Sequence, residues 1–139
     1  MLASSIVAAL RAELACDARV DAAFLFGSAA RGTMRPDSDI DVAIRWKDAA
    51  AREAGRADLL TLLGRLCRSV GRDVDLVDLA QAGPELRRRV YAEGVPIADG
   101  DPRRTRDDHV RATMEVIDWE HARALRRTAV RDQLGSADG

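Results

Sequence analysis

The sequence contains few of the residues that mark specialised classes of protein. Among 139 residues there are two cysteines, four prolines, two tryptophans, two phenylalanines and one tyrosine. Cys16 and Cys67 form no CxxC pair, so neither a zinc site nor a disulfide scaffold is indicated, and we expect buried thiols in a reducing cytoplasm. No apolar run approaches the roughly 20 residues that a membrane-spanning helix needs. The sequence therefore predicts a cytoplasmic protein without membrane contacts.

Neither sign of charge dominates. The chain has 22 basic and 23 acidic residues and a formal net charge of -1, so no overall field attracts nucleic acid or an anionic membrane. Hydrophobic residues make up 47% and charged residues 32%, which is typical of a folded domain. The motifs G-x-G-x-x-G and G-x-x-x-x-G-K-[ST] are absent, so Rossmann and P-loop nucleotide sites are not expected.

The hydrophobic pattern predicts alternating helices and strands. A first helix carries Ile6, Leu10 and Leu14 on one side, with Ser4 or Ser5 available as its cap. The remaining expected elements are a buried strand at 20–26, a strand at 39–44, a helical region at 49–70 ended by Gly71, a strand at 73–79, a helix at 84–92 and an edge strand at 95–97.

A long last helix is expected after residue 101, with Thr105 as its cap. Its apolar face is marked by Val110, Met114, Ile117, His121 and Leu125. We expect one domain, 1–139, with a core at 1–100 and a helix at 101–134 that docks on this core or offers its surplus apolar face to a partner. The expected fold class is α/β (α+β), a small mixed sheet with helices on one side.

Two aspartates stand one residue apart in an apolar strand. Asp39 and Asp41 leave the same face of the strand, about 7 Å apart. Carboxylates in such surroundings are costly unless they are compensated. Mg²⁺ prefers oxygen ligands and is commonly held by one or two carboxylates together with substrate phosphates. The pattern therefore predicts a Mg²⁺ site, with one ion or with a pair about 3.5–4 Å apart.

A glycine–serine pair precedes these aspartates. Gly27 allows a tight turn and the close approach of a ligand, and Ser28 offers a hydroxyl and an N–H group at the start of a helical turn. Arg31 and Arg35 lie in the same stretch, and guanidinium groups match phosphate oxygens well. These four residues are the predicted nucleotide-binding set.

A third carboxylate is expected on the strand at 73–79. Asp75 stands between Val74 and Leu76, inside the apolar run, where an uncompensated carboxylate is most costly. We predict that Asp75 is the third metal ligand and the base that takes a proton from an attacking hydroxyl. Asp73 shares its face and is the alternative.

These motifs together resemble a known family. The stretch GSAARGTMRPDSDIDVAI is similar to the signature of minimal nucleotidyltransferases of the DNA polymerase β superfamily, and more narrowly to MNT-type antitoxins paired with HEPN toxins. DVDLVDL resembles their third-carboxylate strand, and ELRRRVYAEGVPI resembles the helix and strand that follow. The resemblance covers residues 1–100, and the last helix matches only by position. It implies a polymerase-β-like nucleotidyltransferase fold.

The resemblance also implies a reaction. Asp39, Asp41 and Asp75 would hold two Mg²⁺ ions, while Gly27 and Ser28 would bind the triphosphate of ATP. A hydroxyl would attack the α-phosphate, release pyrophosphate and become AMPylated. In the antitoxin branch the implied acceptor is a tyrosine of a partner HEPN RNase toxin, which is silenced within a hetero-oligomer without direct contact to nucleic acid.

Two other functions stay open at this stage. The chain could be a non-catalytic antitoxin that neutralises its partner by occlusion, although a pure binder has no need of three acids in apolar strands. It could also be a small-molecule nucleotidyltransferase of the aminoglycoside type, although no substrate-binding domain is recognisable after residue 100. Trp46 is expected to pack in the core rather than on a base.

Overall fold

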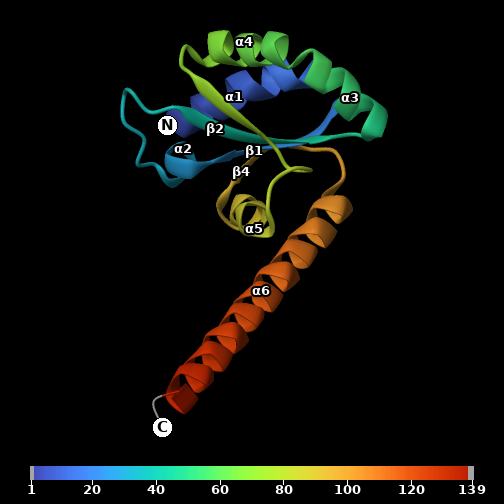
Figure 1. Ribbon diagram of the computed structural model, residues 1–139. Coiled ribbons are helices and arrows are strands. Elements are labelled where there is room, and N and C mark those ends of the chain that lie inside the picture. Colours follow the sequence, from blue (N-terminus) through green and yellow to red (C-terminus); the bar gives the residue numbers. More distant parts are fainter. Residues whose placement is uncertain (1, 138–139) are drawn as a thin grey trace.

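A four-stranded mixed sheet forms the centre of the molecule, and helices lie against both of its faces (Figure 1). The computed structural model describes residues 2–137. The strand order is β3-β2-β1-β4, in which β1 is antiparallel to β2 and β4, and β2 is parallel to β3. The predicted mixed sheet is therefore confirmed, with the fourth strand at an edge as expected.

The elements alternate along the chain much as the hydrophobic pattern predicts. In chain order they are α1 (Leu2–Ala15), β1 (Val20–Phe26), α2 (Gly27–Arg31), β2 (Ile40–Trp46), α3 (Ala49–Ala57), α4 (Leu59–Val70), β3 (Val74–Asp78), α5 (Pro84–Glu93), β4 (Val95–Asp99) and α6 (Pro102–Ala137).

The larger core lies between the sheet and the layer formed by α1, α3 and α4. Leu10 of α1, Ile44 of β2 and Leu66 of α4 are among its fully buried members. Trp46 is also buried in this core, as predicted, and a Cβ built on Gly55 of α3 would overlap its indole ring. This layer fixes β2 in position, because Ile40, Val42 and Ile44 all point into it.

A smaller core on the opposite face corrects the expectation of helices on one side. Phe24 of β1, Ala43 of β2 and Val90 of α5 are buried together there. The ring of Tyr91 meets that of Phe24 edge to face, with centroids 5.6 Å apart. The sequence did not predict the second helix layer because Ala43 of β2 and Ala22 of β1 are small and only weakly hydrophobic. This face of the two strands therefore did not look like one that is buried.

Two local predictions about helix caps are wrong. α1 begins at Leu2, so Ser4 and Ser5 lie inside its first turn. Thr105 lies inside α6, whose first turn is capped by Asp101, since the Arg104 N–H donates to Asp101 Oδ1 at 3.2 Å.

The region 49–70 forms two helices that meet at Asp58 rather than one. The carboxylate of Asp58 accepts a hydrogen bond from Arg19 at 3.1 Å, and the next residue, Leu59, is exposed. Gly71 ends α4 with φ 67°, as predicted.

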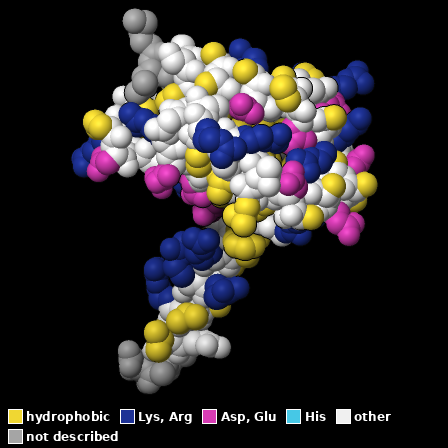
Figure 2. Space-filling model, turned by 90° about the horizontal axis from the view of Figure 1, so that it is seen from above, with side chains coloured by type: hydrophobic (Ala, Val, Ile, Leu, Met, Phe, Trp, Pro, Cys, Tyr) yellow, Lys and Arg dark blue, Asp and Glu magenta, His cyan; other side chains and the backbone are white. Residues whose placement is uncertain are grey.

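The cysteines and the last helix also differ from expectation. Both thiols are free, but Cys16 is exposed and Cys67 only half-buried. The predicted apolar face of α6 points into solvent, because α6 docks on α5 through Ala112 and Val116 instead. Figure 2 shows α6 projecting from the domain with hydrophobic and basic side chains exposed on it. Within residues 2–137, no helix combines the length and apolarity needed to cross a membrane.

Candidate active site

Two parallel strands bring the predicted carboxylates to one end of the sheet. Asp41 of β2 and Asp75 of β3 are register partners, and Asp39 directly precedes β2. Ala43 and Val77, two residues beyond each partner, both belong to the smaller core. Since side chains on one strand alternate between faces, Asp41 and Asp75 share the α5 side of the sheet.

The charges of these residues are coupled. Asp41 is half-buried, and burial is the main cause that raises the pKa of its carboxyl group above the ordinary value. The negative charges of Asp75 and Asp39 raise this pKa further, and the positive charge of Arg31 opposes them. Asp39, Asp75 and Arg31 therefore each lie near enough to Asp41 for their charges to act on it.

Gly27 is required at this site for two reasons. Its φ of +71° lies in the left-handed region that favours glycine. A Cβ built on it would overlap Asp41 Oδ2 and lie 3.1 Å from Asp41 Cγ. The backbone at the start of α2 thus touches the Asp41 carboxylate, and no larger residue fits without displacing it.

Ser28 follows at the first turn of α2 and is half-buried. Its carbonyl accepts hydrogen bonds from the N–H groups of Gly32 and Thr33, which closes the helix. Ser28 is therefore held next to Gly27, on the element that touches Asp41, in keeping with its predicted role.

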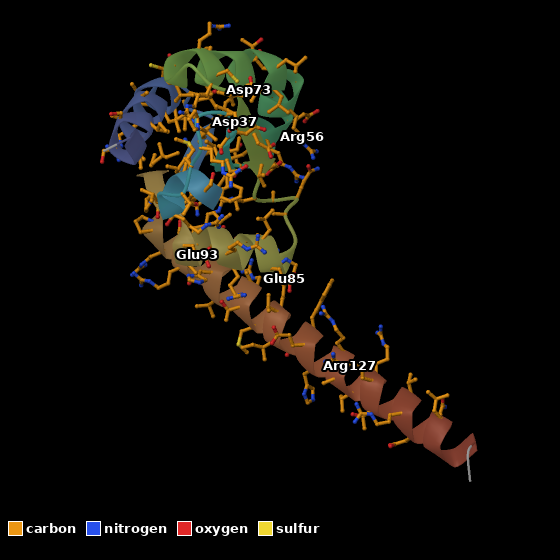
Figure 3. The ribbon with its side chains drawn as sticks, turned by 90° about the vertical axis from the view of Figure 1, so that its left-hand side faces the viewer. Asp37, Arg56, Asp73, Glu85, Glu93 and Arg127 are labelled. Carbon is orange, nitrogen blue, oxygen red and sulfur yellow. The ribbon has the colours of Figure 1, made fainter. Side chains whose placement is uncertain are left out.

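Arg35 and Asp73 lie farther out. Arg35 stands in the loop between α2 and β2, where its N–H donates to Ser38 Oγ at 3.0 Å and its carbonyl accepts from Arg72. Asp73 shares an open hollow of about 480 Å³ with Asp37 and Asp39, beside the end of α4 (Figure 3). The charge coupled to Asp41 is that of Asp75, which supports Asp75 over Asp73 as the third carboxylate.

The donor set fits a hard cation, although the acids do not form a closed cage. Across residues 2–137, no three His, Cys, Asp or Glu side chains are arranged as a ready set of metal ligands. Mg²⁺ usually takes only one or two carboxylates and completes its shell with waters and substrate phosphates, so such a cage is not required. Like charges around Asp41 are what a cation would compensate.

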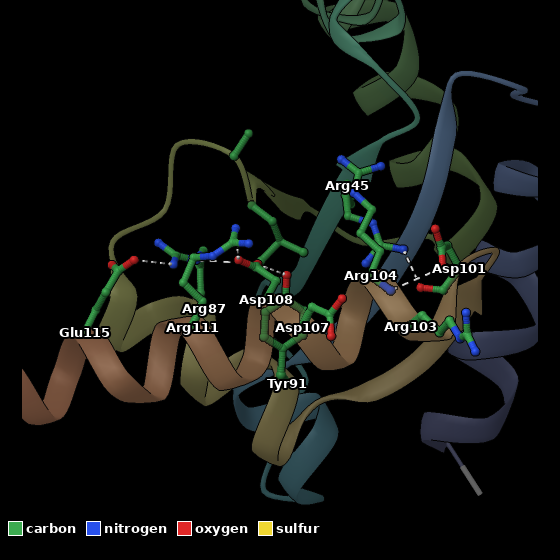
Figure 4. Close-up of a pocket in the computed structure, with 12 residues that line it drawn as sticks. Arg45, Arg87, Tyr91, Asp101, Arg103, Arg104, Asp107, Asp108, Arg111 and Glu115 are labelled. Atoms are coloured by element: carbon green, nitrogen blue, oxygen red, sulfur yellow. Dashed lines mark hydrogen bonds and ion pairs between the residues drawn. The ribbon is translucent and has the colours of Figure 1, made fainter.

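A larger hollow of about 730 Å³ lies elsewhere (Figure 4). Arg45, which lines it, is four residues beyond Asp41 on β2 and thus about 13 Å away along the strand. Several charged side chains that line this hollow have partners within the fold: Arg45 binds Asp21 at 2.7 and 3.0 Å, and Arg87 pairs with Asp108 and Glu115 at 3.5 Å each. We interpret this hollow as the seam along which α6 meets the domain.

Comparison with known proteins decides the reaction class. Residues 9–103 match the family described as polymerase beta nucleotidyltransferase. The chain belongs to this family. The match spans α2 and all four strands, and it ends at the start of α6. The site at the ends of β2 and β3 therefore belongs to a nucleotidyltransferase, as the resemblance of its motifs predicted.

Individual relatives of this nucleotidyltransferase add detail. It is 29% identical to the protein adenylyltransferase MntA of Shewanella oneidensis over 113 residues, which cover 81% of this chain and 76% of MntA. A solved toxin–antitoxin complex with AMP-PNP contains a chain that is 27% identical, with a TM-score of 0.57 and coverage of 96% and 99%. A complex of tri-AMPylated Shewanella oneidensis HEPN toxin with MNT antitoxin matches in fold, at 24% identity, a TM-score of 0.54 and 96% coverage of both chains.

Proposed function

We propose that this nucleotidyltransferase transfers AMP from ATP to a tyrosine hydroxyl of a partner HEPN RNase toxin and acts as its antitoxin. The proposal is supported by a single structural observation, the register pairing of Asp41 with Asp75 beside the backbone of Gly27. It is supported further by the similarity to a protein named protein adenylyltransferase and to a toxin–antitoxin chain solved with AMP-PNP.

The residues would divide the work as follows. Asp39, Asp41 and Asp75 would hold Mg²⁺, with two ions expected, and the metal would neutralise phosphate charge and orient the reacting oxygens. Gly27 lets the Asp41 carboxylate lie against the backbone at the start of α2, and Ser28 would offer its hydroxyl and N–H groups to the phosphates. Arg31 places a positive charge near Asp41, which favours a bound polyphosphate.

The reaction is a substitution at phosphorus. The tyrosine oxygen forms a bond to the α-phosphorus of ATP while the bond from that phosphorus to the bridging oxygen breaks, and pyrophosphate leaves. The proton of the tyrosine hydroxyl passes to the carboxylate of Asp75, which is exposed and so can meet an acceptor from outside. This event occurs in the cytoplasm and requires no nucleic acid.

The whole chain, 1–139, acts as one nucleotidyltransferase domain in this proposal, with 1–100 as its core. The last helix lies almost wholly outside the family match, which ends at residue 103.

The decisive test is AMP transfer to a purified partner. The chain is incubated with Mg²⁺, ATP and the HEPN protein encoded by the neighbouring reading frame, and the intact mass of that protein is measured. We expect a mass gain of one or more AMP groups with the wild type and with Asp37→Asn, which changes an exposed acid of the loop before β2, but not with Asp41→Asn. Tight association without any mass gain would instead support neutralisation by occlusion.

A further inference from the structure

The last helix extends far beyond the domain that it docks on. α6 has 36 residues and is thus about 54 Å long. Val116 is its last buried residue, and every residue from Ile117 to Gly135 is exposed. Figure 1 shows this part of α6 leaving the domain on the α5 side, the side of the sheet that also carries Asp41 and Asp75.

The apolar side chains of α6 form two opposite rows. The inner row faces α5 with Ala112 and Val116 and continues outward through Trp119, Val130 and Leu134. The outer row lies on the other side of the helix, on the face predicted either to dock on the core or to be offered to a partner. It consists of Val110, Met114, Ile117 and Leu125, which are 52–58% exposed.

The outer row needs a partner. A soluble helix normally has one apolar side, which it buries, and a polar side, which faces water. α6 already buries its inner row against α5, so the outer row is an additional apolar surface. Val110, Met114 and Ile117 are spaced by four and three residues, and Leu125 follows two helical turns later with His121 between them, a pattern typical of a seam between two packed helices. Helices without tertiary packing are marginal in water, so a partner there would also stabilise the projecting part.

The charges of the projecting part argue against a lipid or nucleic-acid partner. Between Ile117 and Gly135 there are four arginines and three acidic residues: Arg123, Arg126, Arg127 and Arg131, with Asp118, Glu120 and Asp132. Nucleic-acid and anionic lipid surfaces are met by strongly basic segments. Figure 3 shows one of these arginines, Arg127, on the part of α6 that lies clear of the domain.

A protein acceptor explains both the position and the chemistry of the row. A transferase that modifies one tyrosine of a folded protein gains binding energy from surfaces remote from the reacting group. The solved chain that matches this one over 96% of its length, and hence over most of α6, comes from a toxin–antitoxin complex. A protein held along α6 would lie on the side of the sheet that carries the carboxylates.

We infer that the outer row of α6 is the docking surface for the acceptor protein, separate from the reaction centre. This inference rests on the proposed function, since the occupant is the protein that receives AMP. The contact is a helix–helix seam, with Ile117 and Leu125 as its outermost anchors.

The test compares two double variants of the full chain. Ile117→Glu/Leu125→Glu places charges in the seam, whereas the matched control Ala122→Glu/Ala129→Glu places the same charges on an exposed flank of α6. Affinity for the neighbouring-frame HEPN protein is measured by calorimetry, AMP-PNP affinity is measured in parallel, and helicity is checked by circular dichroism. We expect the seam variant to bind the HEPN protein roughly a hundredfold more weakly, with AMP-PNP affinity and helicity unchanged, and the control to bind as the wild type does.

The outcomes separate docking from chemistry. If the seam variant binds its partner as tightly as the control does, the docking surface is wrong, whatever the transfer activity. If light scattering shows a wild-type dimer that the seam variant abolishes while HEPN affinity is unchanged, the row is an interface between two copies and the inference is overturned. If docking is lost as expected but the wild type never transfers AMP, the surface stands and the proposed function fails.

Discussion

The two ends of β2 carry charge in opposite ways. At the far end, Arg45 is buried and binds Asp21 at 2.7 and 3.0 Å and Thr105 at 2.6 Å. At the near end, Asp41 is half-buried among like charges, with Arg31 as the opposing charge, and its pKa is raised. Both are charges inside an apolar strand.

This difference distinguishes charges that stabilise the fold from charges that serve its function. A buried charge that finds its counterion within the fold serves stability or specificity. A half-buried charge that is surrounded mainly by like charges costs stability, and its compensation must come from outside the fold. Asp41 is of the second kind, which agrees with a site that takes a cation and a nucleotide.

The largest expected effect is that substitutions at Arg45 and at Asp41 change the stability of the fold in opposite directions. Arg45→Met should lower the free energy of unfolding by about 3 kcal/mol, because the partly buried Asp21 loses its main partner. Asp41→Asn should instead raise the melting temperature in Mg²⁺-free buffer, because it removes a charge that burial and its neighbours disfavour. Urea and thermal unfolding measure both. If Arg45→Met stabilised the fold, or if Asp41→Asn strongly destabilised it, the distinction between the two ends of β2 would be wrong.

Two glycine variants test whether the contact between the Gly27 backbone and the Asp41 carboxylate is needed for AMP transfer. Gly27→Ala and Gly32→Ala both force alanine into a left-handed conformation, with φ near +71° and +73°, at a cost of about 1 kcal/mol each. Only at Gly27 would the new Cβ overlap the Asp41 carboxylate, since nothing lies within 4 Å of a Cβ at Gly32. We therefore expect similar unfolding curves but a loss of AMP transfer in Gly27→Ala alone. Equal activity of the two variants would show that the backbone contact is irrelevant.

Much of the near end could be predicted from the sequence, because its signals are local. Alternation in β2 gave the faces of Ile40 and Asp41, and Gly71 and Pro84 marked helix ends correctly. Asp75 was predicted as the third carboxylate from its place between Val74 and Leu76, but its pairing with Asp41 was not, since strand order is not written in any one segment.

The errors arose where tertiary contacts decide. α6 has apolar residues on two sides, and the regular spacing of Val110, Met114 and Ile117 made the outer row the stronger signal in the sequence. The fold uses Ala112 and Val116 instead, since a small residue such as Ala112 lets α5 approach closely. At the break between α3 and α4, Asp58 binds Arg19, which is 39 residues away in the sequence. Arg45 could have been noticed, because a charge flanked by Ile44 and Trp46 is the same kind of signal as Asp41.

The central claim is that Asp75, as the partner of Asp41 across β2 and β3, belongs to the reaction centre, whereas Asp73 does not. The most direct test is the transfer of label from α-labelled ATP by Asp75→Asn and Asp73→Asn, with the HEPN protein as acceptor. We predict that Asp75→Asn loses transfer by roughly a thousandfold, since several kcal/mol of transition-state stabilisation depend on the metal and base, while Asp73→Asn transfers label as the wild type does. Full transfer by Asp75→Asn would contradict the account.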